Sequence, residues 1–487
     1  MNLSDLTIHD AKIMLEKKSI SSVELTKYYI EKISENKNLN CFITETFDQA
    51  IKMAKKLDSK ISSGEELGVM EGIPIAMKDL FCTKNIRTTA GSKILENFVP
   101  FYESTVSENL FADGAVMLGK SNLDEFAMGS ANTTSYFGNV INPWKSKNKK
   151  KLELVPGGSS GGSASAVSAD LCLGATGSDT GGSIRQPAAF CGLVGMKPTY
   201  GRCSRFGMVA FASSLDQAGP ITKNVLDSSI MLKSMCSYDS KDSTSSKTSI
   251  PDFPELVKLG VKGKILGIPK EYKIDGLNSE IQKNWDQGIN WLESEGASVI
   301  EISLPHSSFA LPTYYIIAPA EASANLARYD GIRFGLREKG QDLEELYKNT
   351  RAAGFGNEVK RRIMIGTYVL SAGYYDAYYL KALKVRQLIS DDFSKAFKKC
   401  DFILTPTTPG VAFGLNEKQN DPLEMYLNDV LTVPASLAGL PAVSIPSGLN
   451  SDGLPIGLQI ISKPFDEETC LRAGYIIEKF TNFKELK

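Results

Sequence analysis

Apolar and polar residues follow a helical spacing along the first part of the chain. Three segments show this pattern, at residues 6–17, 22–34 and 48–61. The spacing predicts amphipathic helices, and Ser21 with Glu24 forms a capping box at the start of the second one. We therefore expect an N-terminal helical layer over residues 1–65 that covers a sheet beginning near Gly72.

Short apolar runs alternate with helical patterns through the rest of the chain. The runs predict strands at residues 72–78, 171–176, 264–268, 297–304, 442–446 and 456–461. Helical patterns lie at residues 103–119, 163–169 and 279–295. This alternation is typical of an α/β fold, here a large mixed β-sheet covered by helices on both faces. Asp452-Gly453 would join the last two strands as a hairpin.

No internal repeat is visible, so we predict a single domain over residues 1–487. Beyond the helical layer it would contain a core at residues 66–235 and a helical insertion at residues 305–395. Residues 237–249 are rich in Ser, Asp and Lys, which is typical of a loop. With 487 residues, of which 42% are hydrophobic, the chain is long enough for a large core.

Glycine is concentrated in residues 157–201, which contain 11 of the chain's 41 glycines. Glycine lets the backbone turn sharply and bring its own N–H groups close to a ligand. Residues 179–182 form a tight loop that delivers Ser183 to the start of a helical turn. A serine at such a place has unpaired amide donors beside it, which is what an oxyanion needs. We expect the chemistry to lie here.

Such a serine needs a base, and the chain has only two histidines, His9 and His306. One interpretation is an α/β-hydrolase, because Gly157-x-Ser159-x-Gly161 matches the nucleophile elbow and His306 follows in the right order. The elbow serine should directly follow a strand, whereas residues 145–153 are polar and basic. This difference argues against the hydrolase interpretation.

A second candidate base is Lys78, at the end of the predicted strand 72–78. Burial lowers the pKa of a lysine, and a neutral amine accepts a proton at pH 7. A lysine that ends a strand in solvent is the other interpretation of this fragment.

Together these residues resemble the amidase signature family. The match consists of GGSSGGS at residues 157–163, GSDTGGSIRQPAAFCG at residues 177–192 and the upstream Lys78. The resemblance implies the amidase-signature fold, with Ser183 as nucleophile, Lys78 as ultimate base and Ser159 as the bridge, commonly held by a cis peptide. The oxyanion would be bound by backbone N–H groups of Thr180, Gly181, Gly182 and Ser183. We interpret Asp179 and Arg185 as a buried structural pair.

Three segments of the second half, at residues 314–335, 354–362 and 425–429, are similar to one branch of this family. Its members are glutaminase subunits of a tRNA-dependent amidotransferase. Glutamine is a zwitterion and needs a cation at its carboxylate and an anion at its ammonium. By motif position the resemblance implies these substrate contacts: Arg362 with the carboxylate, Asp429 with the ammonium, Tyr314 as a further contact, and Gly129 and Ser130 along the pocket.

The same resemblance implies two partners in a heterotrimer. A B subunit would receive ammonia and amidate Glu-tRNA(Gln) with ATP and Mg²⁺, and a small C subunit would complete the assembly. This chain has no P-loop motif, so we expect no cofactor in it and expect ATP and Mg²⁺ on the partner subunit. A stand-alone amidase acting on small amides, which should lack the Arg362 and Asp429 pair, and a non-catalytic scaffold are the alternatives.

Charge and cysteine content narrow the class of protein further. The formal net charge of −1 argues against strong nucleic-acid binding by the chain itself. The eight cysteines are scattered without C-x-x-C spacing, which predicts reduced thiols of a cytoplasmic protein and no metal site. No signal peptide or apolar run near ~18 residues is visible. The basic run at residues 145–151, which looks like a loop insertion, is either solvated or contacts RNA.

Overall fold

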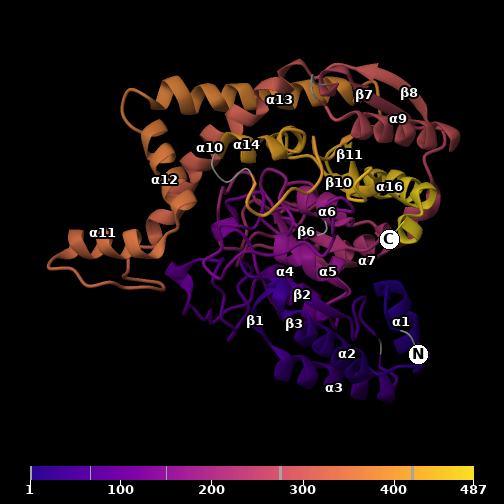
Figure 1. The fold of residues 1–487 in the computed structure, drawn as a ribbon, viewed down its shortest axis with the longest axis horizontal. Coiled ribbons are helices and arrows are strands. Elements are labelled where there is room, and N and C mark those ends of the chain that lie inside the picture. Colours follow the sequence, from indigo (N-terminus) through magenta and orange to yellow (C-terminus); the bar gives the residue numbers. More distant parts are fainter. Residues whose placement is uncertain (1–2, 66, 150, 274–276, 418–421, 487) are drawn as a thin grey trace.

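The computed structural model describes residues 3–65, 67–149, 151–273, 277–417 and 422–486. One mixed sheet of eleven strands runs through these residues, in the order β1-β3-β2-β4-β6-β5-β10-β11-β9-β7-β8. Helices surround the sheet, with the N-terminal helices at the bottom of Figure 1 and the C-terminal half at the top. The predicted α/β fold with a large mixed sheet is confirmed.

The two halves of the chain form the two halves of the sheet. The first half contributes β1 (Phe42–Glu45), β2 (Pro74–Lys78), β3 (Val116–Ser121), β4 (Gly174–Asp179), β5 (Val194–Lys197) and β6 (Gln217–Thr222). The second half contributes β7 (Ile265–Pro269), β8 (Ser298–Ile302), β9 (Phe402–Pro406), β10 (Ala442–Leu449) and β11 (Pro455–Ser462). The halves meet where β5 and β10 pair antiparallel, with Met196 opposite Val443. The predicted hairpin is β10 with β11.

The helices outside the insertion cover both faces of the sheet. They are α1 (Ile8–Glu16), α2 (Ser22–Glu35), α3 (Phe47–Ser63), α4 (Thr105–Ala112), α5 (Gly161–Ser168), α6 (Arg185–Cys191), α7 (Val225–Met235), α8 (Phe253–Leu256), α9 (Ser279–Ser294) and α16 (Glu467–Thr481). Strand β4 has helices packed on both of its faces. If Gly174 carried a Cβ atom, that atom would lie 3.1 Å from Ile8 Cδ1 of α1. A Cβ at Gly177 would lie on the opposite face, 2.8 Å from Ile184 beside α6. The capping box predicted at Ser21 is present.

Residues 305–395, which the sequence predicted to be a helical insertion, are largely helical in the second half of the chain. They contain α10 (Ala310–Asn325), α11 (Leu343–Gly354), α12 (Asn357–Val369), the π-helix η8 (Tyr375–Leu380) and α13 (Lys381–Ala396). In Figure 1, α11 and α12 extend away from the sheet on the left. Two short helices follow, α14 (Pro422–Tyr426) and α15 (Val433–Leu437). The assignment of the whole chain to a single domain stays a prediction.

The helix predicted over residues 103–119 is wrong in its second part. Helix α4 ends at Ala112, the backbone turns at Gly114 with a φ of 89°, and Val116 begins strand β3. All six residues of β3 are buried, so its apolar residues follow one another without alternation. A short apolar run of this kind matches a helical and a strand pattern equally well.

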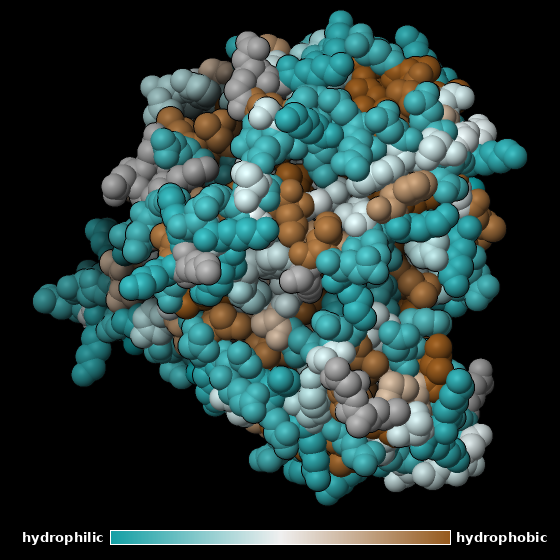
Figure 2. All heavy atoms as spheres, turned by 45° about the vertical axis from the view of Figure 1, so that its right-hand side comes forward, coloured by the Kyte–Doolittle hydropathy of each residue, from teal (hydrophilic) through white to brown (hydrophobic). Residues whose placement is uncertain are grey.

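Surface features are ordinary for a protein of this size. The face in Figure 2 is largely hydrophilic, with hydrophobic side chains in separate patches. No helix in the described ranges is long and apolar enough to cross a membrane. All eight cysteines are buried, and no disulfide joins any two of them in the described part of the chain. In the basic run at residues 145–151, the Lys149 Nζ lies 3.9 Å from Glu417 Oε1. Lys150 falls outside the described residues. Whether this run contacts RNA stays a prediction.

Candidate active site

Strand β2 carries Lys78 at its last position into a fully buried cluster of serines. The Lys78 Nζ lies 2.9 Å from Ser159 Oγ, 2.8 Å from Ser160 Oγ and 2.8 Å from Ser178 Oγ. Lys78 has an exposed fraction of 0%, and this burial lowers the pKa of Lys78 to about 7. The structure thus brings two of the sequence-predicted residues, Lys78 and Ser159, into direct contact.

The three hydroxyls around Lys78 are not equivalent. Ser160 Oγ donates to the Ser178 carbonyl at 3.2 Å, so towards Lys78 it acts as an acceptor. A neutral amine has two N–H donors and one lone pair, so one of its three partners has to donate to it. That donor is Ser159 or Ser178, whose hydroxyl protons are not used by another recorded hydrogen bond in the described part of the chain. The arrangement can pass a proton between Ser159 and Lys78.

Ser183 follows the loop after strand β4 and has an exposed fraction of 8%. The N–H of Ser160 donates to the Ser183 carbonyl at 3.3 Å, so the two glycine-rich loops lie side by side. The peptide between Gly158 and Ser159 is cis. Among the described residues, no acceptor is recorded for the backbone N–H groups of residues 181–183. These amides are available to an oxyanion beside the Ser183 hydroxyl.

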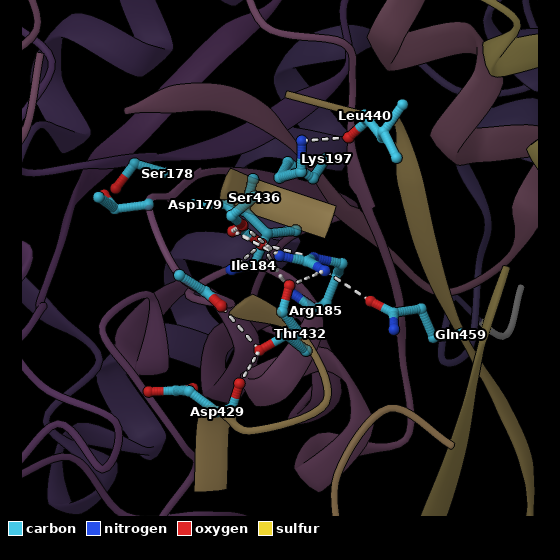
Figure 3. A network of polar contacts seen from close by, with 12 residues as sticks. Ser178, Asp179, Ile184, Arg185, Lys197, Asp429, Thr432, Ser436, Leu440 and Gln459 are labelled. Carbon is cyan, nitrogen blue, oxygen red and sulfur yellow. Dashed lines mark hydrogen bonds and ion pairs between the residues drawn. The ribbon is translucent and has the colours of Figure 1, made fainter. Parts of the chain in front are cut away.

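A buried ion pair holds the loop before Ser183 in place. Arg185 Nη2 lies 2.9 Å from Asp179 Oδ1, and both side chains are fully buried. Burial alone would raise the pKa of Asp179, but the Arg185 guanidinium lowers it below its ordinary value. Figure 3 shows the further donors of Arg185, which bind the Thr432 carbonyl at 2.9 Å and Ser436 Oγ at 2.8 Å. The predicted buried pair is therefore present, and it ties the Ser183 loop to residues 432–436.

A cavity of about 420 Å³ is lined by the loop that follows β3, by α12 and by α14. Gly129, Ser130 and Arg362 line it together with Asp124 and Tyr426. Ser130 Oγ donates to Asp429 Oδ2, which joins Asp429 to this wall. The structure thus brings four of the residues predicted to bind substrate into one place.

The fifth predicted residue, Tyr314, lies against the glycine loop itself, as does Asp429. A Cβ built on Gly181 would lie 2.8 Å from the ring Cζ of Tyr314, and one on Gly182 would lie 3.1 Å from Asp429 Oδ1. Only glycine permits such close approach. Tyr314 and Asp429 therefore lie against the loop that precedes Ser183.

Arg362 is held in a box of aromatic rings. Its guanidinium carbon lies 5.2 Å from the ring centre of Tyr315, 5.4 Å from that of Tyr426 and 5.6 Å from that of Phe211. Its Nε donates to Glu358 Oε1 at 2.8 Å. Within the described ranges no hydrogen bond is recorded for either Nη atom, although Arg362 has an exposed fraction of only 3%. The Nη edge can therefore bind a carboxylate with two parallel hydrogen bonds.

Asp429 has an unsatisfied acceptor. Its Oδ1 is buried and has no hydrogen-bond partner among the described residues. Burial raises the pKa of Asp429 to about 7. Buried polar atoms in proteins are nearly always paired, so this oxygen is available to accept a hydrogen bond from a water or a ligand. An ammonium group would satisfy it and favour the charged carboxylate.

Comparisons with known proteins identify the family of this chain. The family model described as Amidase matches residues 24–471 of the chain. The chain belongs to the amidase family. Membership makes it an enzyme, and the resemblance found in the sequence is confirmed.

Individual relatives cover the amidase chain almost completely. It is 62% identical over 483 residues to the A subunit of the glutamyl-tRNA(Gln) amidotransferase of Caulobacter vibrioides, covering 99% of this chain and 98% of the relative. It is 59% identical over 483 residues to the protein of the same name from Parvibaculum lavamentivorans, with the same coverage.

Two solved structures share the amidase fold over nearly the whole chain. The A subunit of the glutamyl-tRNA(Gln) amidotransferase from Thermotoga maritima has a TM-score of 0.80 at 40% identity and covers 98% of this chain and 95% of its own. The native peptide amidase from Stenotrophomonas maltophilia has a TM-score of 0.83 at 26% identity and covers 99% and 98%.

The hydrolase alternative built on His306 is not supported by this amidase structure. His306 Nδ1 lies 2.9 Å from Asp392 Oδ2, and its ring has no recorded contact with Ser159 in the described part of the chain. Ser159 and the residues directly before it, 155–158, form no strand. The strand before an elbow serine and the histidine base are therefore both missing at this serine.

Several residues of the amidase site were not predicted from the sequence. They are Ser160 and Ser178 beside Lys78, Glu358 and Tyr426 beside Arg362, and Thr432 beside Gly181. Glu358 had a usable signal, because it precedes Arg362 by four residues, a spacing that places both on one face of a helix. The others have no local signal, since their contacts come from segments far apart in the sequence.

Proposed function

We propose that this chain is the glutaminase subunit of a glutamyl-tRNA(Gln) amidotransferase. The relatives that carry that name cover it almost from end to end. The observation that carries the proposal is that the free guanidinium edge of Arg362 lines the same cavity as Ser130, whose hydroxyl holds Asp429 with its unpaired carboxylate oxygen. A cation and an anion on the walls of one small pocket suit a free amino acid better than an uncharged amide.

Hydrolysis would start from neutral Lys78. Ser183 Oγ attacks the side-chain amide carbon of glutamine while its proton passes to Ser159, and the Ser159 proton passes to Lys78. The N–H groups of residues 180–183 bind the oxyanion. The relay then returns the proton to the leaving nitrogen as the C–N bond breaks, which releases ammonia and leaves a glutamyl ester on Ser183. Water cleaves the ester through the same relay and gives glutamate.

The pocket would select glutamine at its α-carbon end. Arg362 binds the α-carboxylate, Asp429 binds the α-ammonium, and Tyr314 contacts the substrate beside Gly181. Gly129 and Ser130 form the wall opposite α12, and the Ser130 hydroxyl holds Asp429 in place.

The rest of the reaction would take place on partner chains. We infer a cytoplasmic heterotrimer in which a B subunit uses the ammonia, with ATP and Mg²⁺, to convert Glu-tRNA(Gln) to Gln-tRNA(Gln), and a small C subunit completes the assembly. No group of three metal-ligating side chains is found in the described part of this chain.

A substrate panel tests this proposal against the stand-alone amidase. The chain would be assayed alone and with its copurified partners on glutamine, asparagine and short aliphatic amides. We expect glutamine to be preferred over the short aliphatic amides by at least about 100-fold in kcat/KM, since uncharged amides leave the buried charges of the pocket unpaired. Asparagine carries the same charges but is one methylene shorter, so we expect a preference of about 10- to 200-fold over it. Comparable rates on small amides by the chain alone would instead identify a stand-alone amidase.

The pH dependence of kcat follows from the lowered pKa of Lys78. The relay needs the neutral amine, which is populated above the Lys78 pKa of about 7. We therefore expect kcat at saturating glutamine to rise about tenfold per pH unit below pH 7 and to level off above it. Saturation matters because Asp429 also has a pKa raised to about 7 and is held charged by bound ammonium. A flat kcat between about pH 5.5 and 7 would contradict a lysine base.

A further inference from the structure

Thr432 lies between the Asp429 turn and the glycine loop, just before α15. It is fully buried, and its Oγ1 lies 2.7 Å from the Gly181 carbonyl oxygen and 3.0 Å from that of Asp429. Figure 3 shows its side chain between Asp429 on one side and the Asp179 and Arg185 pair on the other. One hydroxyl therefore touches both the loop that faces the oxyanion and the turn that faces the substrate ammonium.

The hydroxyl proton of Thr432 has two possible acceptors. The Asp429 carbonyl is the farther one, and it already accepts the Thr432 N–H at 3.1 Å. The Gly181 carbonyl is closer, and in the described ranges no other hydrogen bond to it is recorded. The geometry therefore favours donation to Gly181.

The direction of the Gly181 carbonyl fixes the direction of the next amide. In a planar trans peptide the C=O of one residue and the N–H of the following residue point in opposite directions. Holding the Gly181 oxygen on Thr432 therefore turns the Gly182 N–H away from Thr432. Because both residues are glycines, no side chain hinders rotation of this peptide unit. An external bond has to define its orientation.

Thr432 is itself held in a fixed position. Its carbonyl accepts from Arg185 Nη1 at 2.9 Å, within the buried pair with Asp179. A Cβ at Gly182 would lie 2.2 Å from Thr432 Oγ1, so the loop packs directly on the hydroxyl. The bond is therefore made by a rigid donor at close range.

We propose that Thr432 is a positioning residue for oxyanion binding. Its hydroxyl orients the Gly181–Gly182 peptide so that the Gly182 N–H faces the oxyanion that forms when Ser183 attacks. The inference rests on the proposed function, and it concerns a residue that touches neither the scissile bond nor the proton relay.

The test compares Thr432→Val with Thr432→Ser in the assembled complex, with glutamine as substrate. Valine removes the hydroxyl at nearly constant shape, whereas serine keeps it. We expect Thr432→Val to lower kcat by about 10- to 100-fold and to change KM by less than about threefold, because oxyanion contacts form only in the transition state. Thr432→Ser should restore most of kcat.

A matched control is Thr222→Val on β6. It removes a hydroxyl that donates to the Asn224 carbonyl at 2.9 Å, and Thr222 does not line the cavity. It should leave kcat unchanged. If a valine methyl is too large beside Gly181 and the melting temperature falls, Thr432→Ala removes the hydroxyl without added bulk and repeats the measurement.

Three outcomes would overturn the inference. The first is a kcat within about threefold of wild type in both Thr432→Val and Thr432→Ala. The second is a variant whose KM rises while its kcat stays unchanged. The third is an equal loss of amidation rate when free ammonia replaces glutamine as nitrogen donor. Failure of the proposed function is distinguishable, because then the wild-type complex would show no glutaminase activity that depends on Ser183.

Discussion

Replacing Ser183 by alanine is expected to abolish glutamine hydrolysis while the chain remains folded. The Ser183 hydroxyl is the predicted nucleophile and makes no recorded side-chain hydrogen bond in the described residues, so its removal costs the fold little. Loss of a nucleophile or its base in a serine hydrolase lowers kcat by roughly four to six orders of magnitude. Lys78→Ala should have nearly the same effect, because no other base contacts Ser159 in the part of the chain that the structure describes.

Glutaminase assays and thermal melting of purified complexes check this expectation. Lys197 offers a matched control, since it is also buried and burial lowers its pKa to about 7. Its Nζ donates to the Pro198 carbonyl at 3.1 Å and to the Leu440 carbonyl, and no serine partner is recorded for it among the described residues. Lys197→Met should therefore lower stability more than kcat. Substantial glutaminase activity in Ser183→Ala would refute the mechanism.

The second expected result concerns the identity of the substrate. Arg362→Ala and Asp429→Ala each remove one charge and leave the opposite charge of glutamine unpaired in a largely buried pocket. Each should weaken transition-state binding by roughly 2–4 kcal/mol, which lowers kcat/KM for glutamine by about 30- to 1000-fold. Free ammonia as nitrogen donor should bypass the defect in the complex, because ammonia does not occupy the glutamine pocket.

Both donors would be measured on each variant complex. Arg361→Ala is the control for Arg362, because Arg361 is the preceding residue of α12, lines the same cavity and is 44% exposed at its side chain. Its loss should be several times smaller. Equal losses with glutamine and with ammonia would mean that Arg362 and Asp429 maintain the structure and do not read the substrate.

Sequence patterns predicted the parts of the fold and site that are local. The strand ending at Lys78, the glycine loop before Ser183 and the capping box at Ser21 all depend on residues close together in the chain, and the structure contains each of them. The boundary between α4 and β3 was missed because a buried strand and a short helix share the same apolar pattern.

The substrate-facing residues needed the resemblance to a family. An isolated arginine at residue 362 or aspartate at residue 429 is indistinguishable from a surface charge in the sequence. Thr432 and Gly181 illustrate the limit, because their contact joins segments of the two halves of the chain that lie 251 residues apart. The local pattern of apolar and polar residues cannot predict such a contact.

The pairing of β5 with β10 also bears on when the enzyme becomes active during its synthesis. Lys78, Ser159 and Ser183 all lie in the half of the chain that leaves the ribosome first, whereas Arg362, Asp429 and Thr432 leave it late and β10 follows them. On the proposed mechanism, a nascent chain carries the residues of the proton relay long before those that bind glutamine and orient the Gly181 peptide. On this mechanism, the order of the segments would keep unfinished chains from consuming glutamine.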